Sequence, residues 1–204
     1  IMHGPVRISS PDAMPFVKMA AFDVANRIMT LLTANNISAV IGNWVRARTL
    51  GVVDGVDYMS TGWVERILTD QLNTLLEDGI VPIFPCVGWS SSGEPYNVSS
   101  NELAGKLAQA VGASKLFIIQ NGKKDWPSRM TVSEAETFLE SGTAIDYDSS
   151  ELLKLARDTC IGGVERVHVV NGSRDGIILQ EVFSNLGAGT MVYANKYEQI
   201  RSIQ

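Results

Sequence analysis

A short polar segment carries the side chains that are best suited to bind a ligand. It follows an apolar run from Ile80 to Val87 and precedes an amphipathic helix that begins near Ser99. In α/β proteins, ligands lie beyond the carboxyl ends of buried strands, where backbone N–H groups and helix dipoles point outward. The segment therefore predicts a site for a small polar ligand or anion. Its neutral hydrogen-bonding groups belong to Ser90, Ser91, Ser92, Tyr96 and Asn97.

The elements that position this segment alternate between helical and extended patterns. Helices are predicted over residues 11–35, 69–78, 174–184 and 196–204. Strands are predicted over residues 38–49, 62–67, 115–119, 166–170 and 190–193. This alternation predicts the α/β class, with a mainly parallel sheet that helices cover on both faces.

Two finer predictions concern strand pairing and helix starts. We expect Ile80–Val87, Leu116–Ile119 and Val167–Val170 to be inner strands, and residues 40–67 to form an antiparallel excursion around a turn. Capping boxes, in which the first residue accepts a helix N–H and a glutamate reaches back, mark helix starts. Their spacing occurs at Ser99…Glu102, Thr131…Glu134 and Asp148…Glu151.

Composition narrows the classes of function. The 204 residues are 45% hydrophobic, which is enough for one sizeable core, and the net charge of −5 makes nucleic acid and anionic membranes poor partners. No apolar run approaches the roughly 18 residues of a membrane span, and no signal peptide is visible. Cys86 and Cys160 have no metal-binding spacing, so we expect reduced, packed cysteines in a cytoplasmic protein without a metal site.

A longer motif around the polar segment resembles the amino-acid kinase family. The matching residues are Gly79, Ile80, Pro82, Ile83, Pro85, Gly88, Gly93, Tyr96, Asn97, Ala104, Gly105, Lys115 and Leu116. Within that family, the stretches 50–58, 179–184 and 198–201 are similar to the kinase-like domain of the N-acetylglutamate synthases. The resemblance implies a three-layer αβα sandwich with a mainly parallel open sheet.

The resemblance also implies which parts of such a domain this chain contains. Residues 1–204 are expected to be one kinase-like domain that is incomplete at its N-terminus, with the glycine-rich loop and first lysine upstream of Ile1. The acetyltransferase domain, with its acetyl-CoA site, is expected to lie outside this chain. No cofactor is therefore expected within it.

Two residues match the family's carboxylate-binding positions. The resemblance implies that Arg7 and Asn97 hold the α-carboxylate of acetylglutamate or glutamate, and a guanidinium fork fits a carboxylate bidentately. The catalytic positions of the kinases have changed. Asn101 stands in place of an aspartate, Leu152 in place of a lysine, and Gln120-Asn121 where the family has Leu-Thr-Asp. We expect no catalytic residues and no phosphoryl transfer.

A second set of positions resembles the family's regulatory arginine site. It consists of His168, Glu181, Gly187 and Gly189. Glu181 could pair with a guanidinium or ammonium group, and the glycines allow close approach of the backbone. Taken singly, the residues are more typical of a solvated helix charge, turn glycines and a half-buried strand histidine. Their joint spacing favours the ligand site instead.

The sequence thus predicts a kinase-like regulatory and assembly domain in arginine biosynthesis. It is expected to bind L-arginine as an allosteric effector, to form a homo-oligomer and to be inactive as a kinase. Two alternatives stay open: an active acetylglutamate kinase, and a structural or oligomerisation module without catalysis.

Overall fold

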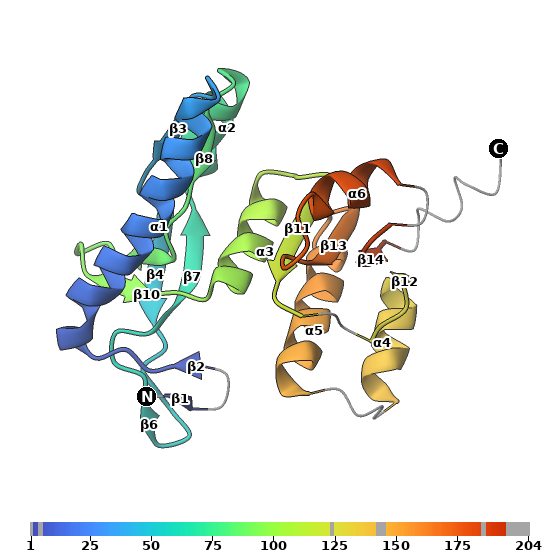
Figure 1. Cartoon of the computed structure of the whole chain (residues 1–204). Helices are drawn as coiled ribbons and strands as arrows, with labels where there is room; N and C mark the ends of the chain where they lie inside the picture. The colour runs from blue at the N-terminus through green and yellow to red at the C-terminus, as the bar shows by residue number, and fades with distance from the viewer. Residues whose placement is uncertain (1, 4–5, 123–124, 142–145, 185–186, 195–204) are drawn as a thin grey trace. The chain divides into compact units, whose positions relative to one another are not determined.

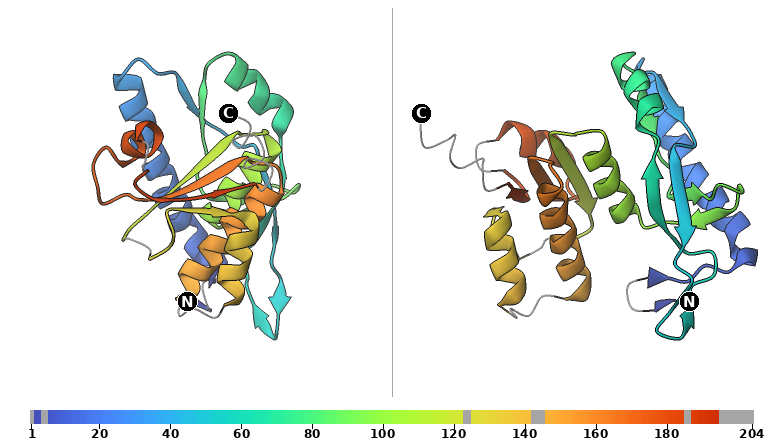
Figure 2. Two further views of the ribbon diagram at one scale, coloured as in Figure 1. Left: turned by 90° about the vertical axis from the view of Figure 1, so that its right-hand side faces the viewer. Right: turned by 180° about the vertical axis from the view of Figure 1, so that it is seen from behind.

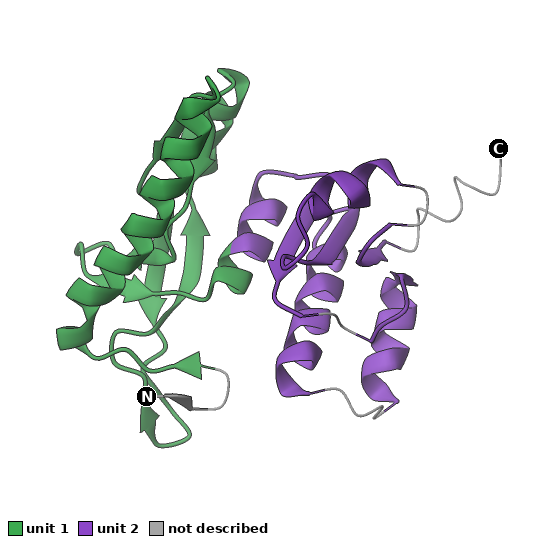
Figure 3. Cartoon of the chain, viewed as in Figure 1, with its two compact units in different colours: residues 1–103 green, residues 104–204 purple. Residues whose placement is uncertain are grey.

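The computed structural model describes residues 2–3, 6–122, 125–141, 146–184 and 187–194. It divides the chain into two compact units, Ile1–Leu103 and Ala104–Gln204 (Figure 3). The helix predicted over 196–204 and the stretch 198–201 lie outside the described residues. Each unit has sheets and helices of its own.

Unit 1 is built around a four-stranded sheet with the order β10-β9-β4-β7. Its elements are β1 (Met2–His3), β2 (Val6–Arg7), the 3-10 helix η1 (Pro11–Ala13), α1 (Met14–Ala34), β3 (Ala39–Ile41), β4 (Val45–Thr49), β5 (Val52–Val53), β6 (Val56–Asp57), β7 (Gly62–Ile67), α2 (Thr69–Glu77), β8 (Val81–Ile83), β9 (Val87–Trp89) and β10 (Pro95–Asn97). Strands β3 and β8 form a separate parallel pair, and α1 packs against β3 and β10 (Figure 1).

The expected excursion is confirmed, but the expected strand Ile80–Val87 is wrong. Strands β4 and β7 pair antiparallel, and β5 and β6 form a hairpin whose turn places Asp54 and Gly55 at φ 51° and 78°. The stretch 80–87 splits instead into β8, which pairs with β3, and β9, which pairs with β4 and β10. Pro85 lies at the break, where its fixed φ and missing N–H end the ladder.

Unit 2 contains a second four-stranded sheet with the order β11-β13-β14-β12. Its elements are β11 (Lys115–Gln120), β12 (Arg129–Thr131), α4 (Val132–Glu140), α5 (Tyr147–Ile161), β13 (Arg166–Asn171), α6 (Ile177–Phe183) and β14 (Thr190–Tyr193), and α3 (Ser100–Ala110) spans the division between the units. Strands β11 and β13 are parallel, whereas β13 and β14 are antiparallel. The α/β class is therefore confirmed. Within the described sheet β13 is an inner strand, but β11 lies at the edge.

Alternation along β13 separates the two faces of this sheet. Val167 and Val169 pack into a buried cluster with side chains of α5 such as Leu153 and Ala156. His168 points to the other face, where it contacts Glu181 of α6. Helices thus cover the sheet on both sides, with α4 and α5 on one face and α6 on the other (Figure 1, Figure 2).

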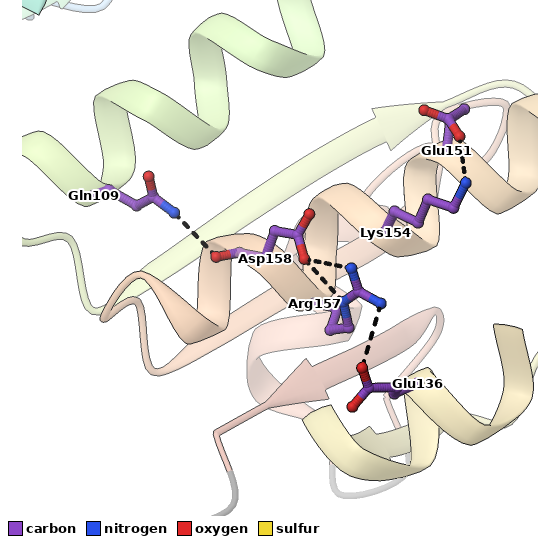
Figure 4. A network of polar contacts seen from close by, with 6 residues as sticks. All are labelled: Gln109, Glu136, Glu151, Lys154, Arg157 and Asp158. Carbon is purple, nitrogen blue, oxygen red and sulfur yellow. Dashed lines mark hydrogen bonds and ion pairs between the residues drawn. The ribbon is translucent and has the colours of Figure 1, made fainter. Parts of the chain in front are cut away.

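Polar contacts join the helices that cover the first face (Figure 4). Arg157 of α5 pairs with Asp158 at 2.7 Å and reaches Glu136 of α4 at 3.9 Å. Gln109 of α3 donates from Nε2 to the Asp158 carbonyl at 3.1 Å. These surface contacts contribute little free energy individually, so the buried cluster beneath them supplies most of the stability.

One expected capping box is complete, and two are corrected. Thr131 and Glu134 cap α4 reciprocally. Helix α5 begins at Tyr147, and its cap is Asp146, which accepts from the Ser149 N–H, rather than Asp148.

The second correction concerns one half of the box at the start of α3, since Ser99 Oγ does accept from the Glu102 N–H at 3.4 Å. Glu102 Oε1 accepts from the Val64 N–H at 3.0 Å instead of reaching back to its own helix. Val64 lies beside an irregularity in the β4–β7 register, where its N–H needs a partner outside the ladder. The Glu102 carboxylate therefore accepts from a strand N–H rather than from an N–H at the start of its own helix.

Candidate functional site

Arg7 and Asn97 lie in one cluster of unit 1, although 90 positions separate them in the chain. The Asn97 amide donates to Ser9 Oγ at 2.9 Å, and the Ser9 N–H donates to Thr61 Oγ1 at 2.9 Å. Thr61 Oγ1 in turn donates to the Arg7 carbonyl at 2.7 Å. The Arg7 side chain is exposed. Ser9 and Thr61 were not foreseen from the sequence, because only the pairing of distant strands brings them together.

The serine-rich loop uses its polar groups internally. Ser90 and Ser92 hydroxyls are 2.8 Å apart, and Ser90 Oγ accepts from the Glu94 N–H at 3.0 Å. The Tyr96 hydroxyl donates to Glu94 Oε2 at 3.0 Å. These contacts close the turn between β9 and β10, so three of the groups predicted to bind a ligand stabilise a hairpin.

The positions where the sequence departs from the kinase pattern carry a buried leucine and an exposed asparagine. Leu152 is 5% exposed and belongs to the buried cluster of unit 2. Lys154, the nearest lysine, is exposed and pairs with Glu151 at 2.8 Å. Asn101 is exposed in the first turn of α3. A lysine at position 152 would have to enter the core.

His168 and Glu181 are in direct contact. His168 Nδ1 lies 2.7 Å from Glu181 Oε1, and the Gly189 N–H donates to Glu181 Oε2 at 2.9 Å. The Ala188 N–H donates to the same oxygen. The Glu181 side chain is 4% exposed, so α6 buries a carboxylate that is held on both oxygens.

The two glycines are required by close packing. Gly187 has φ +67°, and a Cβ there would lie 3.1 Å from Glu181 Oε2. A Cβ at Gly189 would lie 2.2 Å from the Val169 carbonyl oxygen, which is too close for any side chain. The segment that precedes β14 therefore lies against both the glutamate and the sheet because it has no side chains at these positions.

The protonation states of the pair follow from its surroundings. Burial raises the pKa of Glu181, but the N–H groups of Ala188 and Gly189 and the contact with His168 outweigh it, so the pKa is lowered overall. Burial lowers the pKa of His168 more than Glu181 raises it. At neutral pH the glutamate is therefore ionised and the histidine neutral, with its Nδ1–H donated to the carboxylate.

This tautomer makes the other ring nitrogen of His168 an acceptor. Nε2 is buried and has no hydrogen-bond partner among the described residues. The ring is stacked on Phe117, with 4.6 Å between centroids and 12° between planes. A buried acceptor without a partner costs free energy, and a ligand that donates an N–H would satisfy it.

The pair borders a cavity of about 150 Å³ on the α6 face of the sheet. It lies at the amino ends of β11 and β13, because their first residues, Lys115 and Arg166, line it. Arg129 adds a third cation. The remaining lining residues are Phe117, Ser128, His168, Glu181, Val182, Ser184, Gly187 and Met191. The lining combines cations, one buried anion and one acceptor, which suits a small ligand bearing both charges.

The three cations of this cavity were not predicted from the sequence. Lys115 and Arg166 are register partners on parallel strands, so their side chains share a face with Phe117 and His168 two positions later. Strand alternation could have placed each cation on the histidine's face, but not the pairing of the strands. Gly189 contacts Glu181 through its N–H but does not line the cavity.

The described residues contain no group of three or more His, Cys, Asp or Glu side chains that could hold a metal ion. Likewise, no helix in the described ranges has the length and apolar character to cross a membrane.

Known proteins share this architecture. An amino-acid acetyltransferase of Salmonella arizonae is 34% identical, over 98% of this chain and 49% of the relative. The chain therefore spans about half the length of the curated relatives it matches. The structure of N-acetylglutamate synthase from Neisseria gonorrhoeae complexed with coenzyme A and N-acetyl-glutamate has a TM-score of 0.88 and 26% identity, over 95% of this chain and 46% of that chain.

A second structure of the same Neisseria gonorrhoeae enzyme, complexed with coenzyme A and L-arginine, has a TM-score of 0.86. At 24% identity, over 95% of this chain and 48% of that chain, it shows a shared fold. Residues 16–171 match the family model of the amino acid kinase family. These residues make up more than half of the sequence, and the chain belongs to the amino acid kinase family.

Proposed function

We propose that this chain is a regulatory and assembly domain that binds L-arginine in the cavity beside His168 and Glu181. The observation that carries the proposal is the buried Nε2 of His168, an acceptor without a partner among the described residues, at a cavity lined by three cations. The similarity to amino-acid acetyltransferases, and the L-arginine complex of a protein with the same fold, support this choice of ligand.

Each charged group of L-arginine has a counterpart in the cavity. The α-carboxylate suits Lys115, Arg129 and Arg166, while a guanidinium N–H can be donated to His168 Nε2. Glu181 accepts three hydrogen bonds from the protein, and a carboxylate has about four acceptor sites. The negative charge of Glu181 and its fourth acceptor position therefore stay available to a cationic group of L-arginine.

A thermal-shift titration of the natural polypeptide that carries this sequence tests the proposal. A ligand that binds only the folded state stabilises it by about 2.7 kcal/mol at a hundred-fold excess over Kd. L-arginine is expected to raise the midpoint by several degrees, whereas D-arginine and L-lysine are not. Equal shifts with all three compounds would indicate a nonspecific solute effect and would overturn the proposal.

We also propose that the domain has no kinase activity. The burial of Leu152 and the neutral side chain of Asn101 support this part of the proposal, since phosphoryl transfer requires charge neutralisation around the transferring group. The test supplies ATP, Mg²⁺ and acetylglutamate and traps acyl phosphate as hydroxamate. Turnover in the usual enzyme range of roughly 1–10³ s⁻¹ would establish the alternative, an active acetylglutamate kinase.

Unit 1 is proposed to bind acetylglutamate or glutamate through Arg7 and Asn97. The chain of hydrogen bonds from Asn97 through Ser9 and Thr61 to the Arg7 carbonyl supports a common site. Removing the guanidinium in Arg7→Ala is expected to weaken binding by about 2–5 kcal/mol in calorimetry. Unchanged affinity in this variant would remove Arg7 from the site.

The assembly role is proposed to rest on α1. Of its residues only Met14 and Ala25 are buried, and it exposes an apolar stripe at helical spacing. The stripe consists of Phe16 (68% exposed), Met19 (66%), Val24 (55%), Ile28 (45%) and Leu31 (67%). At 1.5 Å per residue the helix is about 30 Å long, and an apolar strip of that length marks an interaction surface.

The charges on α1 favour a second copy of the chain as the partner. In an antiparallel pair of α1 helices centred on Ala25, Asp23 of each copy lies opposite Arg27 of the other, and Met19 lies opposite Leu31. Such a surface is complementary to itself, as a two-fold symmetric interface requires. We therefore propose a homo-oligomer that includes this contact.

A further inference from the structure

Two Asn-Gly dipeptides end neighbouring parallel strands of unit 2. Asn121-Gly122 follows β11, and Asn171-Gly172 begins at the last residue of β13. Because Gln120 and Asn171 are register partners, both dipeptides lie at the same carboxyl edge of the sheet. The two dipeptides differ in the hydrogen bonds made by the asparagine side chain and the glycine N–H. These groups take part in the deamidation of Asn-Gly.

An asparagine that precedes glycine can lose its side-chain amide without an enzyme. The glycine nitrogen attacks the asparagine Cγ; a new C–N bond closes a succinimide ring, and the bond to the side-chain nitrogen breaks to release ammonia. Water then opens the ring and leaves aspartate or isoaspartate, so one water is consumed and one ammonia is released. The attack needs an unengaged glycine N–H and a mobile asparagine side chain, and glycine has no Cβ to obstruct it.

Asn171-Gly172 is held against this reaction. The Gly172 N–H donates to the Gln120 carbonyl at 2.8 Å, which occupies the attacking nitrogen. Asn171 Oδ1 accepts from the Ser173 N–H at 3.1 Å and from Ser173 Oγ at 2.8 Å, which fixes the side chain. A Cβ at Gly172 would lie 2.5 Å from Ile119 Cγ2, so the backbone is also packed.

Within the part of the chain that the structure describes, Asn121-Gly122 shows none of these restraints. Both residues are exposed, and Gly122 has φ +82° with no atom within 4 Å of the position of a Cβ. Among the described residues, neither the Asn121 side chain nor the Gly122 N–H makes a hydrogen bond. We propose that Asn121 is a site of spontaneous deamidation in the folded protein and that Asn171, in the same dipeptide on the neighbouring strand, is protected.

The modification would add a negative charge at the carboxyl edge of the sheet. The cavity lies at the opposite end, where Lys115 and Arg166 begin the same two strands. The variant Asn121→Asp is therefore expected to leave the response to L-arginine unchanged. Failure of the arginine proposal and failure of this inference are thus independent outcomes.

Peptide mass mapping of the natural polypeptide after incubation in heavy-oxygen water at mildly alkaline pH tests the inference. The Asn121 peptide is expected to gain the label and to contain isoaspartate, while the Asn171 peptide converts several-fold more slowly. In denatured protein the two peptides should convert at similar rates, because the difference arises from the fold. Ser173→Ala removes the hydroxyl donor to Asn171 Oδ1 and leaves the backbone one, so it should speed conversion at Asn171. Asn121→Gln should abolish conversion at position 121.

Equal rates at the two asparagines in the folded protein would overturn the inference. It would also fail if Asn121 stayed intact in the folded protein while the denatured control converted, because the exposed dipeptide would then be protected.

Discussion

Nδ1 of His168 on β13 lies 2.7 Å from Oε1 of Glu181 on α6, and this contact links the sheet to the helix above it. The other oxygen of Glu181 accepts from the N–H groups of Ala188 and Gly189. One buried carboxylate thus holds a strand, a helix and the segment leading into β14. Because that segment borders the cavity, stability and ligand binding are expected to respond to the same changes.

The first prediction is that acid destabilises unit 2 through this pair. The ordinary pKa of His168, 6.5, is lowered in the folded protein, so between pH 6.5 and that lower value the unfolded chain binds a proton that the folded one does not. The free energy of unfolding therefore falls as the pH falls through this range. Glu181 acts in the same direction at lower pH. Its pKa is lowered from 4.5, so its stabilising effect is present above pH 4.5 and lost as the pH falls through the folded value.

Urea unfolding at a series of pH values measures this dependence. His168→Gln removes the titrating ring, so the variant should show a smaller loss of unfolding free energy just below pH 6.5. The same slope in both proteins would mean that other groups cause the acid sensitivity.

The second prediction separates backbone strain from ligand contact. Gly187 and Gly112 both have positive φ, at +67° and +62°, so alanine at either is expected to destabilise by about 1–2 kcal/mol. Only at Gly187 does the new Cβ approach Glu181, whereas nothing lies within 4 Å at Gly112. Gly187→Ala should therefore also weaken the L-arginine response in calorimetry, and Gly112→Ala should not. An equal loss of response in both variants would point to general destabilisation.

The third prediction concerns assembly through α1. Val24 and Leu31 are 55% and 67% exposed, so a charge there does not disturb the fold of one chain but would be buried in a helix pair. Val24→Asp combined with Leu31→Asp should shift the molar mass in light scattering toward the monomer. Asn73→Asp, a change to the same residue at an exposed polar position of α2, should leave the mass unchanged. An unaltered mass in the double variant would exclude α1 from the interface.

Local signals in the sequence predicted local structure well. The long helix and the Thr131–Glu134 cap were correct because helical periodicity and capping act within a few residues. The cap of α5 was misplaced by two residues, since Asp146 and Asp148 are equally suited and only the fold decides. The apolar pattern of the stretch 80–87 predicts one strand, because it does not show that the chain changes sheets at Pro85.

The residues of the candidate site also fall into two groups, those that the sequence predicted and those that it did not. His168 and Glu181 were identified from a family pattern, and the structure brings them into contact. The cations Lys115, Arg129 and Arg166 were missed because they start three different strands and meet only when those strands pair. Tertiary pairing, rather than any local pattern, gives the cavity its charge.

The most direct test of the regulatory role is calorimetric titration of L-arginine into the natural polypeptide and two variants. Glu181→Ala removes the buried anion and is expected to weaken binding by about 2–5 kcal/mol. Glu136→Ala makes the same change in charge on α4, away from the cavity lining, and should bind like the unaltered protein. Saturable binding that is lost only in Glu181→Ala is the predicted result. Absence of binding in the unaltered protein, or equal binding in all three, would contradict an arginine site at His168 and Glu181.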